Sequence, residues 1–194
     1  MTVRDSERRG TNDPAVHGDA TETGRYGLVR QGEAVQTPAT FADWVGMSVV
    51  AVVAFVADWI TKAIATDQLV LGESHSILPF LDLQRIHNTG VAFSRLSGRQ
   101  SIVMALTIVA VTWILIYFRR SGGRHRYVPP GIGLLVGGAI GNFVDRLRHG
   151  YVTDFIHVSH WPVFNLADVF ITIGVATLLL GLLRHEHRTR LDTA

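Results

Sequence analysis

The chain has 194 residues, 47% of them hydrophobic, and a positive mean hydropathy of +0.25. The formal net charge is only +2 at pH 7, so no nucleic-acid partner is needed to explain the basic residues. The sequence contains no cysteine, which excludes disulfides, thiolate metal sites and a cysteine nucleophile. The apolar residues are concentrated in blocks, a pattern typical of a membrane protein.

The first 40 residues differ in composition from the rest of the chain. Residues 1–40 are rich in Gly, Thr, Asp, Glu and Arg and have no periodic apolar face. Such a segment cannot bury enough apolar surface to fold by itself, so we expect a disordered tail. The first apolar block begins only near Trp44, which favours a retained membrane span over a cleavable signal peptide.

Three apolar segments have the length and composition of membrane-spanning helices. Residues 101–118 contain no charge, and residues 164–183 contain one, over about the twenty residues that cross a hydrocarbon core. Residues 44–65 are similar in length but are interrupted by an aspartate and a lysine. We expect all three to be transmembrane helices.

A fourth segment, residues 128–146, is rich in glycine. Such a segment can be an irregular soluble stretch, but in lipid small residues permit close helix contact, which favours an interior helix. The sequence therefore predicts an α-helical membrane protein with a four-helix bundle over residues 41–184. Residues 66–100 form an extracytoplasmic loop after the first helix, and residues 185–194 form a second tail.

Arginines predict the orientation of this bundle. The loop between the second and third helices carries four of them and the C-terminal tail three, and the positive-inside rule places both in the cytoplasm. With four spans the N-terminus is also cytoplasmic, in agreement with five arginines that precede the first helix. These residues are Arg119, Arg120, Arg124 and Arg126, then Arg184, Arg188 and Arg190, and finally Arg4, Arg8, Arg9, Arg25 and Arg30.

This orientation brings polar residues from several segments to the outer end of the bundle. Asp58 lies about 21 Å beyond Trp44, at a helical rise of about 1.5 Å per residue. Ionisable groups at such positions usually face the bundle interior, where they pair or act. The convergent residues are Asp58, then Asn142, Asp145 and Arg146 at the end of the third helix, Asp154 just beyond it, and Asn165 and Asp168 at the start of the fourth.

Two carboxyls at one depth can form an aspartic dyad, in which one keeps a proton and the other activates water for attack on a carbonyl. In a structural alternative, Asp145 pairs with Arg146 or Arg148, and Asp168 caps the fourth helix at the positive end of its dipole. The spacing of these residues leaves both interpretations open.

Two other classes of function are also compatible with parts of the pattern. Asp154, His157 and His160 form a D-x-x-H-x-x-H motif, and three such residues could bind zinc. Intramembrane acids also relay protons in transporters. In a transporter, however, the acids should lie nearer the membrane midplane and the two halves of the chain should show repeat symmetry. The sequence shows neither of these transporter features.

Four blocks occur in a characteristic order along the chain: DWITK at residues 58–62, NTGVAFS at 88–94, GNFVDRLRHGYVTDF at 141–155 and FNLADVFI at 164–171. In this order they resemble the motifs of the lipoprotein signal peptidases, the prokaryotic signal peptidase II family of membrane aspartyl proteases. The resemblance covers roughly residues 42–183, and the long N-terminal tail is the main departure from it.

The resemblance implies a four-transmembrane-helix bundle with a small extracytoplasmic β-cradle, formed from the loop at residues 66–100. It implies an aspartic endopeptidase of the bacterial inner membrane, with its active site at the outer face. The substrates would be prolipoproteins that carry a diacylglyceryl group on a cysteine, cleaved just before that cysteine. No metal or organic cofactor is implied, and membrane lipids would be the other partners.

The resemblance also assigns expected roles to individual residues. It implies that Asp154 and Asp168 are the catalytic pair. The residues implied to line the site, bind the substrate backbone or order the dyad are Asn88, Asn142, Arg146 and Asn165. The residues implied to be structural are Asp58, Lys62, Gly90 and Asp145.

Overall fold

The structure is a computed structural model, and it describes residues 38–90, 100–121 and 126–191. The predicted N-terminal tail lies outside the described residues up to position 37, as do residues 91–94 of the NTGVAFS block and Arg124. Residues 182–191 are described by their backbone alone, so the side chains of the C-terminal arginines are also outside the description.

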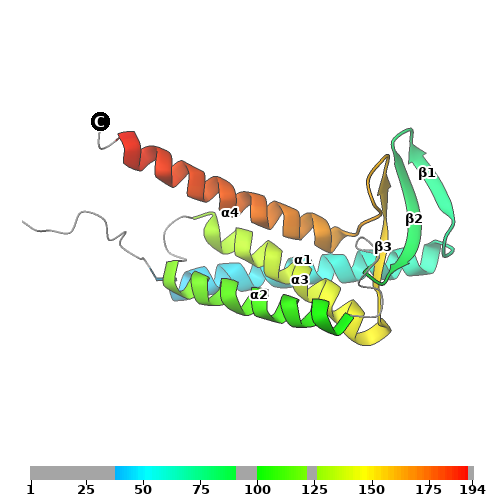
Figure 1. The fold of residues 1–194 in the computed structure, drawn as a ribbon, viewed down its shortest axis with the longest axis horizontal. Helices are drawn as coiled ribbons and strands as arrows, with labels where there is room; N and C mark the ends of the chain where they lie inside the picture. Colours follow the sequence, from blue (N-terminus) through cyan, green and yellow to red (C-terminus); the bar gives the residue numbers. More distant parts are fainter. Residues whose placement is uncertain (1–37, 91–99, 122–125, 192–194) are drawn as a thin grey trace, which may run out of the picture. The chain divides into compact units, whose positions relative to one another are not determined.

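Four α-helices are found in the described part of the chain (Figure 1): α1 Phe41–Gln68, α2 Gln100–Ser121, α3 Val128–His149 and α4 Leu166–Leu191. By length and composition, α1, α2 and α3 can each cross a membrane, and the apolar part of α4, Leu166–Gly181, is shorter. The helical membrane fold predicted from the apolar blocks is therefore confirmed.

The central helix of the bundle is α3, which packs along both α1 and α4 and also contacts α2. In the apolar stretch of α3, 61% of the residues are buried, against 17% in α1 and 6% in α2. The helix α3 is therefore the interior helix that its glycines predicted. A Cβ added at Gly133 would lie 2.6 Å from the Met47 carbonyl oxygen, and one at Gly138 would lie 2.5 Å from that of Ala167. These glycines let α3 approach the backbones of α1 and α4.

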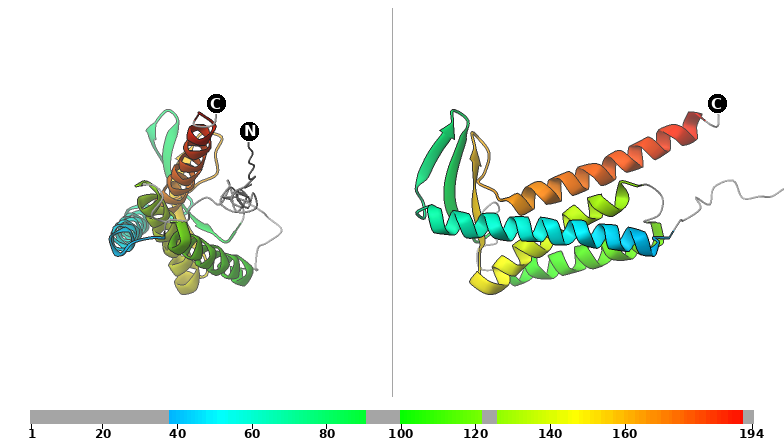
Figure 2. Two further views of the ribbon diagram at one scale, coloured as in Figure 1. Left: turned by 90° about the vertical axis from the view of Figure 1, so that its left-hand side faces the viewer. Right: turned by 180° about the vertical axis from the view of Figure 1, so that it is seen from behind.

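A three-stranded antiparallel sheet lies across one end of the bundle (Figure 2). Its order is β1-β2-β3, with β1 at Ser74–Leu78, β2 at Leu81–Asn88 and β3 at Val152–Val158. The first two strands form in the loop where short strands were expected. The third was not predicted, although its sequence, VTDFIHV, has a partly alternating pattern and β-branched residues.

The position of β3 depends on the turn that follows α3. Gly150 ends this helix with φ at 78°, a left-handed conformation that glycine adopts without strain, and its N–H donates to the Arg146 carbonyl. The chain then enters β3, where Asp154 lies opposite Ile86 and Val152 lies opposite Asn88. Because side chains two residues apart share a face of a strand, Asn88 and Asp154 lie on the same face of the sheet.

We predict that Gly133→Ala lowers the free energy of unfolding by about 1–3 kcal/mol, because the added methyl group must displace the backbone of α1. Thermal unfolding in detergent measures this effect. Gly46→Ala is the matched control, since a Cβ there meets nothing within 4 Å. Equal melting temperatures for the two variants would contradict the close packing of α1 on α3.

Candidate active site

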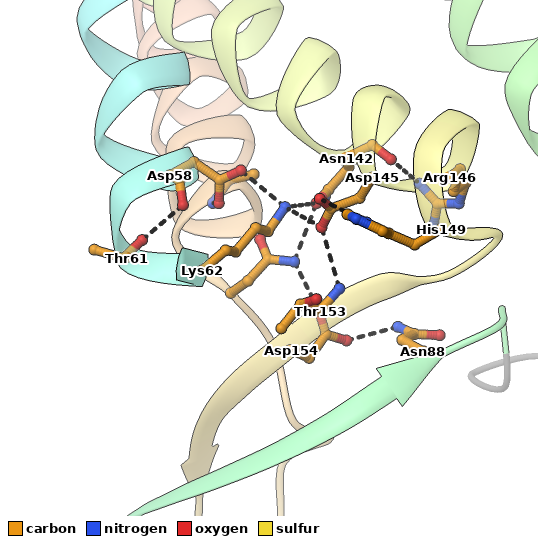
Figure 3. A network of polar contacts seen from close by, with 12 residues as sticks. Asp58, Thr61, Lys62, Asn88, Asn142, Asp145, Arg146, His149, Thr153 and Asp154 are labelled. Atoms are coloured by element: carbon orange, nitrogen blue, oxygen red, sulfur yellow. Dashed lines mark hydrogen bonds and ion pairs between the residues drawn. The ribbon is translucent and has the colours of Figure 1, made fainter. Parts of the chain in front are cut away.

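Polar side chains from five elements meet where the sheet joins the helices. Figure 3 shows those that come from α1, α3, β2 and β3, and the start of α4 contributes the others. Most of these side chains are buried, so each needs a partner to offset the loss of hydration. They are Asp58 and Lys62 on α1, Asn88 on β2, Asn142, Asp145 and Arg146 on α3, Asp154 on β3, and Asn165 and Asp168 at the start of α4.

The ammonium group of Lys62 lies at the centre of the buried part of this network. Its Nζ is 2.8 Å from Asp58 Oδ2 and 3.0 Å from Asp145 Oδ2, and it donates to Asn142 Oδ1 at 2.9 Å. The contact with Asn142 is a hydrogen bond, whereas the contact with Asp58 Oδ2 is an ion pair without hydrogen-bond geometry. The Lys62 side chain is only 6% exposed, which makes these contacts the replacement for its water shell.

The contacts of Asp145 differ from those of the structural alternative, in which it paired with Arg146 or Arg148. That pairing is wrong: Asp145 pairs with Lys62 on α1 and also accepts the backbone N–H of Thr153 at 3.1 Å. Successive residues on a helix are rotated by about 100°, so the position next to Asp145 points to a different side of α3. Asp145 therefore connects three elements, α1, α3 and β3.

Asp58 has an equivalent connecting role on the other side of Lys62. Its Oδ1 accepts the backbone N–H of Ala167 in the first turn of α4, at 2.9 Å. The first N–H groups of a helix have no acceptor within the helix, so this carboxylate satisfies one that would otherwise be unpaired. Asp58 thereby joins α1 to the start of α4.

Asn165 and Asp168 form a capping box at the start of α4. The Asn165 side chain accepts the Asp168 N–H at 3.1 Å, and Asp168 Oδ2 accepts the Asn165 N–H at 3.2 Å. The other carboxylate oxygen of Asp168 accepts from Asn142 Nδ2 at 2.8 Å. Asp168 thus caps α4, as the structural alternative expected. It also contacts the polar network, and its side chain remains partly exposed.

Asp154 has no exposed surface, and both of its oxygens accept hydrogen bonds. Asn88 Nδ2 donates to Oδ2 at 2.7 Å, and Asn165 Nδ2 donates to Oδ1 at 2.6 Å. The Asn88 amide is oriented by the Gly90 N–H, which donates to its oxygen at 2.8 Å, and Gly90 has φ at 94°. Asn165 therefore contacts both aspartates, Asp154 through its side chain and Asp168 through its backbone and side chain.

Burial raises the pKa of Asp154 to about 6, and the charge of Asp168 acts in the same direction. The hydrogen bonds from Asn88 and Asn165 and the charge of Lys62 lower this pKa and so oppose the shift. A carboxyl with this pKa exchanges its proton near neutral pH, which suits a general acid or base.

Arg146 lies one helical turn beyond Asn142 on the same face of α3. Its guanidinium donates from Nη1 to the Asn142 carbonyl at 3.2 Å and is partly exposed. Among the described residues it has no second hydrogen bond or close ion pair, although the charges of Asp154, Asp168 and Asp145 act on it. An arginine has five N–H donors, so most of them are available to a ligand at this site.

The D-x-x-H-x-x-H residues are not brought together by the structure. Asp154 and His157 are three residues apart in β3 and so point to opposite faces of the sheet. His157 Nδ1 lies 3.4 Å from Asp82 Oδ2 on β2, and His160 is exposed in the turn that follows. In the described ranges, no group of three His, Asp or Glu side chains is placed to hold a metal ion.

Three members of the network were missed by sequence reasoning. Thr153 and Ala167 contribute backbone N–H groups, so their side chains carry no signal of this role. Gly141 faces Asp58 and leaves room for its carboxylate. The glycine-rich sequence of α3 predicted close packing of this helix, but it did not indicate which glycine faces a polar group.

Comparisons with known proteins agree with one another. A family model described as "Signal peptidase (SPase) II" matches residues 50–184. The lipoprotein signal peptidase of Symbiobacterium thermophilum is 38% identical over 146 residues, which cover 72% of this chain and 95% of that protein. The one from Paraburkholderia phymatum is 39% identical over 158 residues, which cover 78% and 93%.

The fold is also similar to that of a solved protein described as a bacterial membrane enzyme, whose structure was determined by the in meso method at 1.9 Å resolution. The TM-score is 0.68 with 30% sequence identity, and the match covers 76% of this chain and 97% of that chain.

We predict that Asp145→Asn lowers the free energy of unfolding by on the order of 3 kcal/mol, because the buried Lys62 ammonium loses one of its two counter-charges. Unfolding in detergent measures the loss. Glu73→Gln serves as control, because Glu73 is 60% exposed and surface ion pairs contribute little. An Asp145→Asn protein as stable as the control would show that this carboxylate does not hold Lys62.

Proposed function

The chain belongs to the signal peptidase II family, and we propose that Asp154 and Asp168 form its catalytic dyad. Membership makes it an aspartic endopeptidase that removes signal peptides from prolipoproteins. A peptidase family also leaves the proton-coupled transporter interpretation without support.

One observation carries the assignment of the dyad, namely that Asn165 contacts both carboxyls. Its side-chain amide donates to Asp154 and its backbone N–H donates to Asp168, at 2.6 and 3.2 Å. One residue therefore holds both acids at the same place although they lie on different elements. The two environments differ, because Asp154 is fully buried whereas Asp168 is partly exposed.

This difference assigns a role to each carboxyl in the proposed mechanism. Asp154 holds the proton of the pair, since its burial raises its pKa to about 6. Asp168 accepts a proton from a water molecule as that water attacks the scissile carbonyl, and Asp154 donates its proton to the carbonyl oxygen. When the C–N bond breaks, the departing amine takes the proton from Asp168, and Asp154 recovers its own from the hydroxyl of the tetrahedral intermediate.

Arg146 is the residue that we assign to the substrate backbone. Its guanidinium has directed donors that fit peptide carbonyls, and one of them already bonds the Asn142 carbonyl beside the dyad. Asn142 and Asn165 order the carboxyls, and Asn88 holds Asp154.

We propose that cleavage occurs just before a cysteine that carries diacylglycerol. The site lies at the end of the helices where the sheet begins, so the lipid chains can stay in the bilayer while the peptide bond meets the dyad (Figures 1 and 3). In this arrangement the enzyme lies in the bacterial inner membrane with the sheet outside and both termini in the cytoplasm.

The first prediction from this mechanism concerns the two aspartates. Asp154→Asn and Asp168→Asn should each abolish cleavage of a purified diacylglyceryl prolipoprotein, because the amide keeps the shape but cannot exchange the proton. The double variant should be little worse than either single one, since residues that act as one unit are not additive. Chelators should leave the wild-type rate unchanged.

Controls separate these effects from misfolding. Both single variants should insert and unfold like the wild type, and Asp145→Asn should retain measurable activity in the protein that folds. Substantial cleavage by either dyad variant, or zinc dependence of the wild type, would overturn the assignment.

The second prediction concerns pH. The alkaline limb of kcat/KM should lie near pH 6, because the free enzyme loses the Asp154 proton there. Asn88 donates to the ionised carboxylate and so lowers this pKa; Asn88→Ala should therefore raise it and move the limb to higher pH. Gln84→Ala on the same strand is the control. If the alkaline limb of the kcat/KM profile of Asn88→Ala stays in place or moves to lower pH, the role of this hydrogen bond is contradicted.

The third prediction concerns orientation in the membrane. Arg120 lies in the last turn of α2, near the start of α1, where the Ala39 N–H donates to the Arg119 carbonyl. Ser159 follows β3. Because the natural chain has no cysteine, an Arg120→Cys variant should resist an impermeant thiol reagent added to intact cells, and Ser159→Cys should react. The reverse labelling pattern would invert the proposed topology.

A further inference from the structure

Each proposed catalytic aspartate follows a residue whose backbone N–H is held by a buried carboxylate. Ala167, which precedes Asp168, donates to Asp58 Oδ1 at 2.9 Å. Thr153, which precedes Asp154, donates to Asp145 Oδ2 at 3.1 Å. The two aspartates lie on separate elements, α4 and β3, yet their backbones are anchored in the same way.

The two anchoring carboxylates share a single cation. Lys62 Nζ lies 2.8 Å from Asp58 Oδ2 and 3.0 Å from Asp145 Oδ2. One ammonium therefore limits how far apart the two anchors can lie, and with them the backbones that carry the dyad. We call Asp58, Lys62 and Asp145 the ion cluster.

Gly141 on α3 is in direct contact with this cluster. A Cβ built there would overlap Asp58 Oδ2 and lie 3.2 Å from Asp58 Cγ, and the three nearest atoms all belong to the Asp58 side chain. Gly133 and Gly138 differ, because the atom nearest to their added Cβ is a backbone carbonyl oxygen of a neighbouring helix. The lack of a side chain at Gly141 thus leaves room for the Asp58 carboxylate. The lack of a side chain at Gly133 and Gly138 lets the neighbouring helices pack closely.

We propose that the ion cluster sets the separation of the catalytic carboxyls and that Gly141 is a positioning residue, which supplies the space that Asp58 needs. This inference rests on the proposed dyad of Asp154 and Asp168. Gly141 acts through Asp58, which acts through the Ala167 N–H on the first turn of α4, where Asp168 is held.

The variant Gly141→Ala tests this chain of contacts without altering a charge. Its methyl group must push the Asp58 carboxylate away from Lys62, from the Ala167 N–H or from both, and Asp168 then moves relative to Asp154. A misplacement of about 1 Å can reduce a rate roughly 100-fold, so we expect kcat to fall about 10- to 100-fold. KM should change little, because the atoms nearest the added methyl group belong to Asp58 and not to Arg146, the residue that we assign to the substrate backbone.

Gly133→Ala is the matched control, because it adds the same methyl group to the same helix, eight residues before Gly141, where the nearest atoms belong to Met47 and Val50 rather than to Asp58. Both full-length variants are assayed in detergent on a diacylglyceryl prolipoprotein, below the melting temperature of each. We expect both to lose stability, but only Gly141→Ala to lose kcat. A Gly141→Ala protein that is folded and has wild-type kcat would overturn the proposal, as would an equal loss of kcat in Gly133→Ala.

A second variant provides a test that does not require Gly141→Ala alone to fold. Asp58→Ala removes the group that the methyl would displace, so it should also lower kcat, and adding Gly141→Ala to it should cause little further loss. Wild-type kcat in folded Asp58→Ala, or full additivity in the double variant, would overturn the proposal. The dyad itself is judged separately: cleavage by Asp154→Asn or Asp168→Asn refutes the proposed function, whatever Gly141→Ala does.

Discussion

The structure depends on one buried cation. Moving an ammonium out of water costs several kcal/mol, and only close, well-directed acceptors offset that loss. Lys62 Nζ lies within 3.0 Å of Asp58, Asp145 and Asn142, which lie on two different helices, so two opposite charges and one hydrogen bond offset its lost hydration. Each of the two carboxylates then accepts a backbone N–H from a further element, so the helices and β3 are held around a single charge.

This arrangement explains why groups that stabilise the fold lie so close to groups proposed to carry out chemistry. Asn142 accepts from Lys62 and donates to Asp168, so it belongs to both sets. In a site with little water, each hydrogen bond is stronger and each unpaired group more costly, and a fully connected network is the stable solution. The glycines of α3 contribute by letting the helices approach closely enough for these short side chains to meet.

The local sequence determined much of this structure. The lengths of the apolar blocks predicted the helices, because crossing hydrocarbon requires about twenty apolar residues with internally satisfied backbones. The glycines predicted that α3 is an interior helix, because small residues permit close helix contact in lipid. The resemblance of four motifs predicted the family, which the comparisons then showed.

Other features were decided only by the tertiary structure. The partner of Asp145 was wrongly expected among neighbouring arginines, because a charge on a helix pairs with whatever the next helix presents, and Lys62 lies 83 residues earlier in the chain. The strand β3 forms because β2 supplies its hydrogen-bonding partners, and β2 precedes it by more than 60 residues. The roles of Thr153 and Ala167 depend on backbone N–H groups, which every residue except proline has. The sequence by itself thus determined which segments enter the membrane, whereas three-dimensional packing decided which polar groups meet.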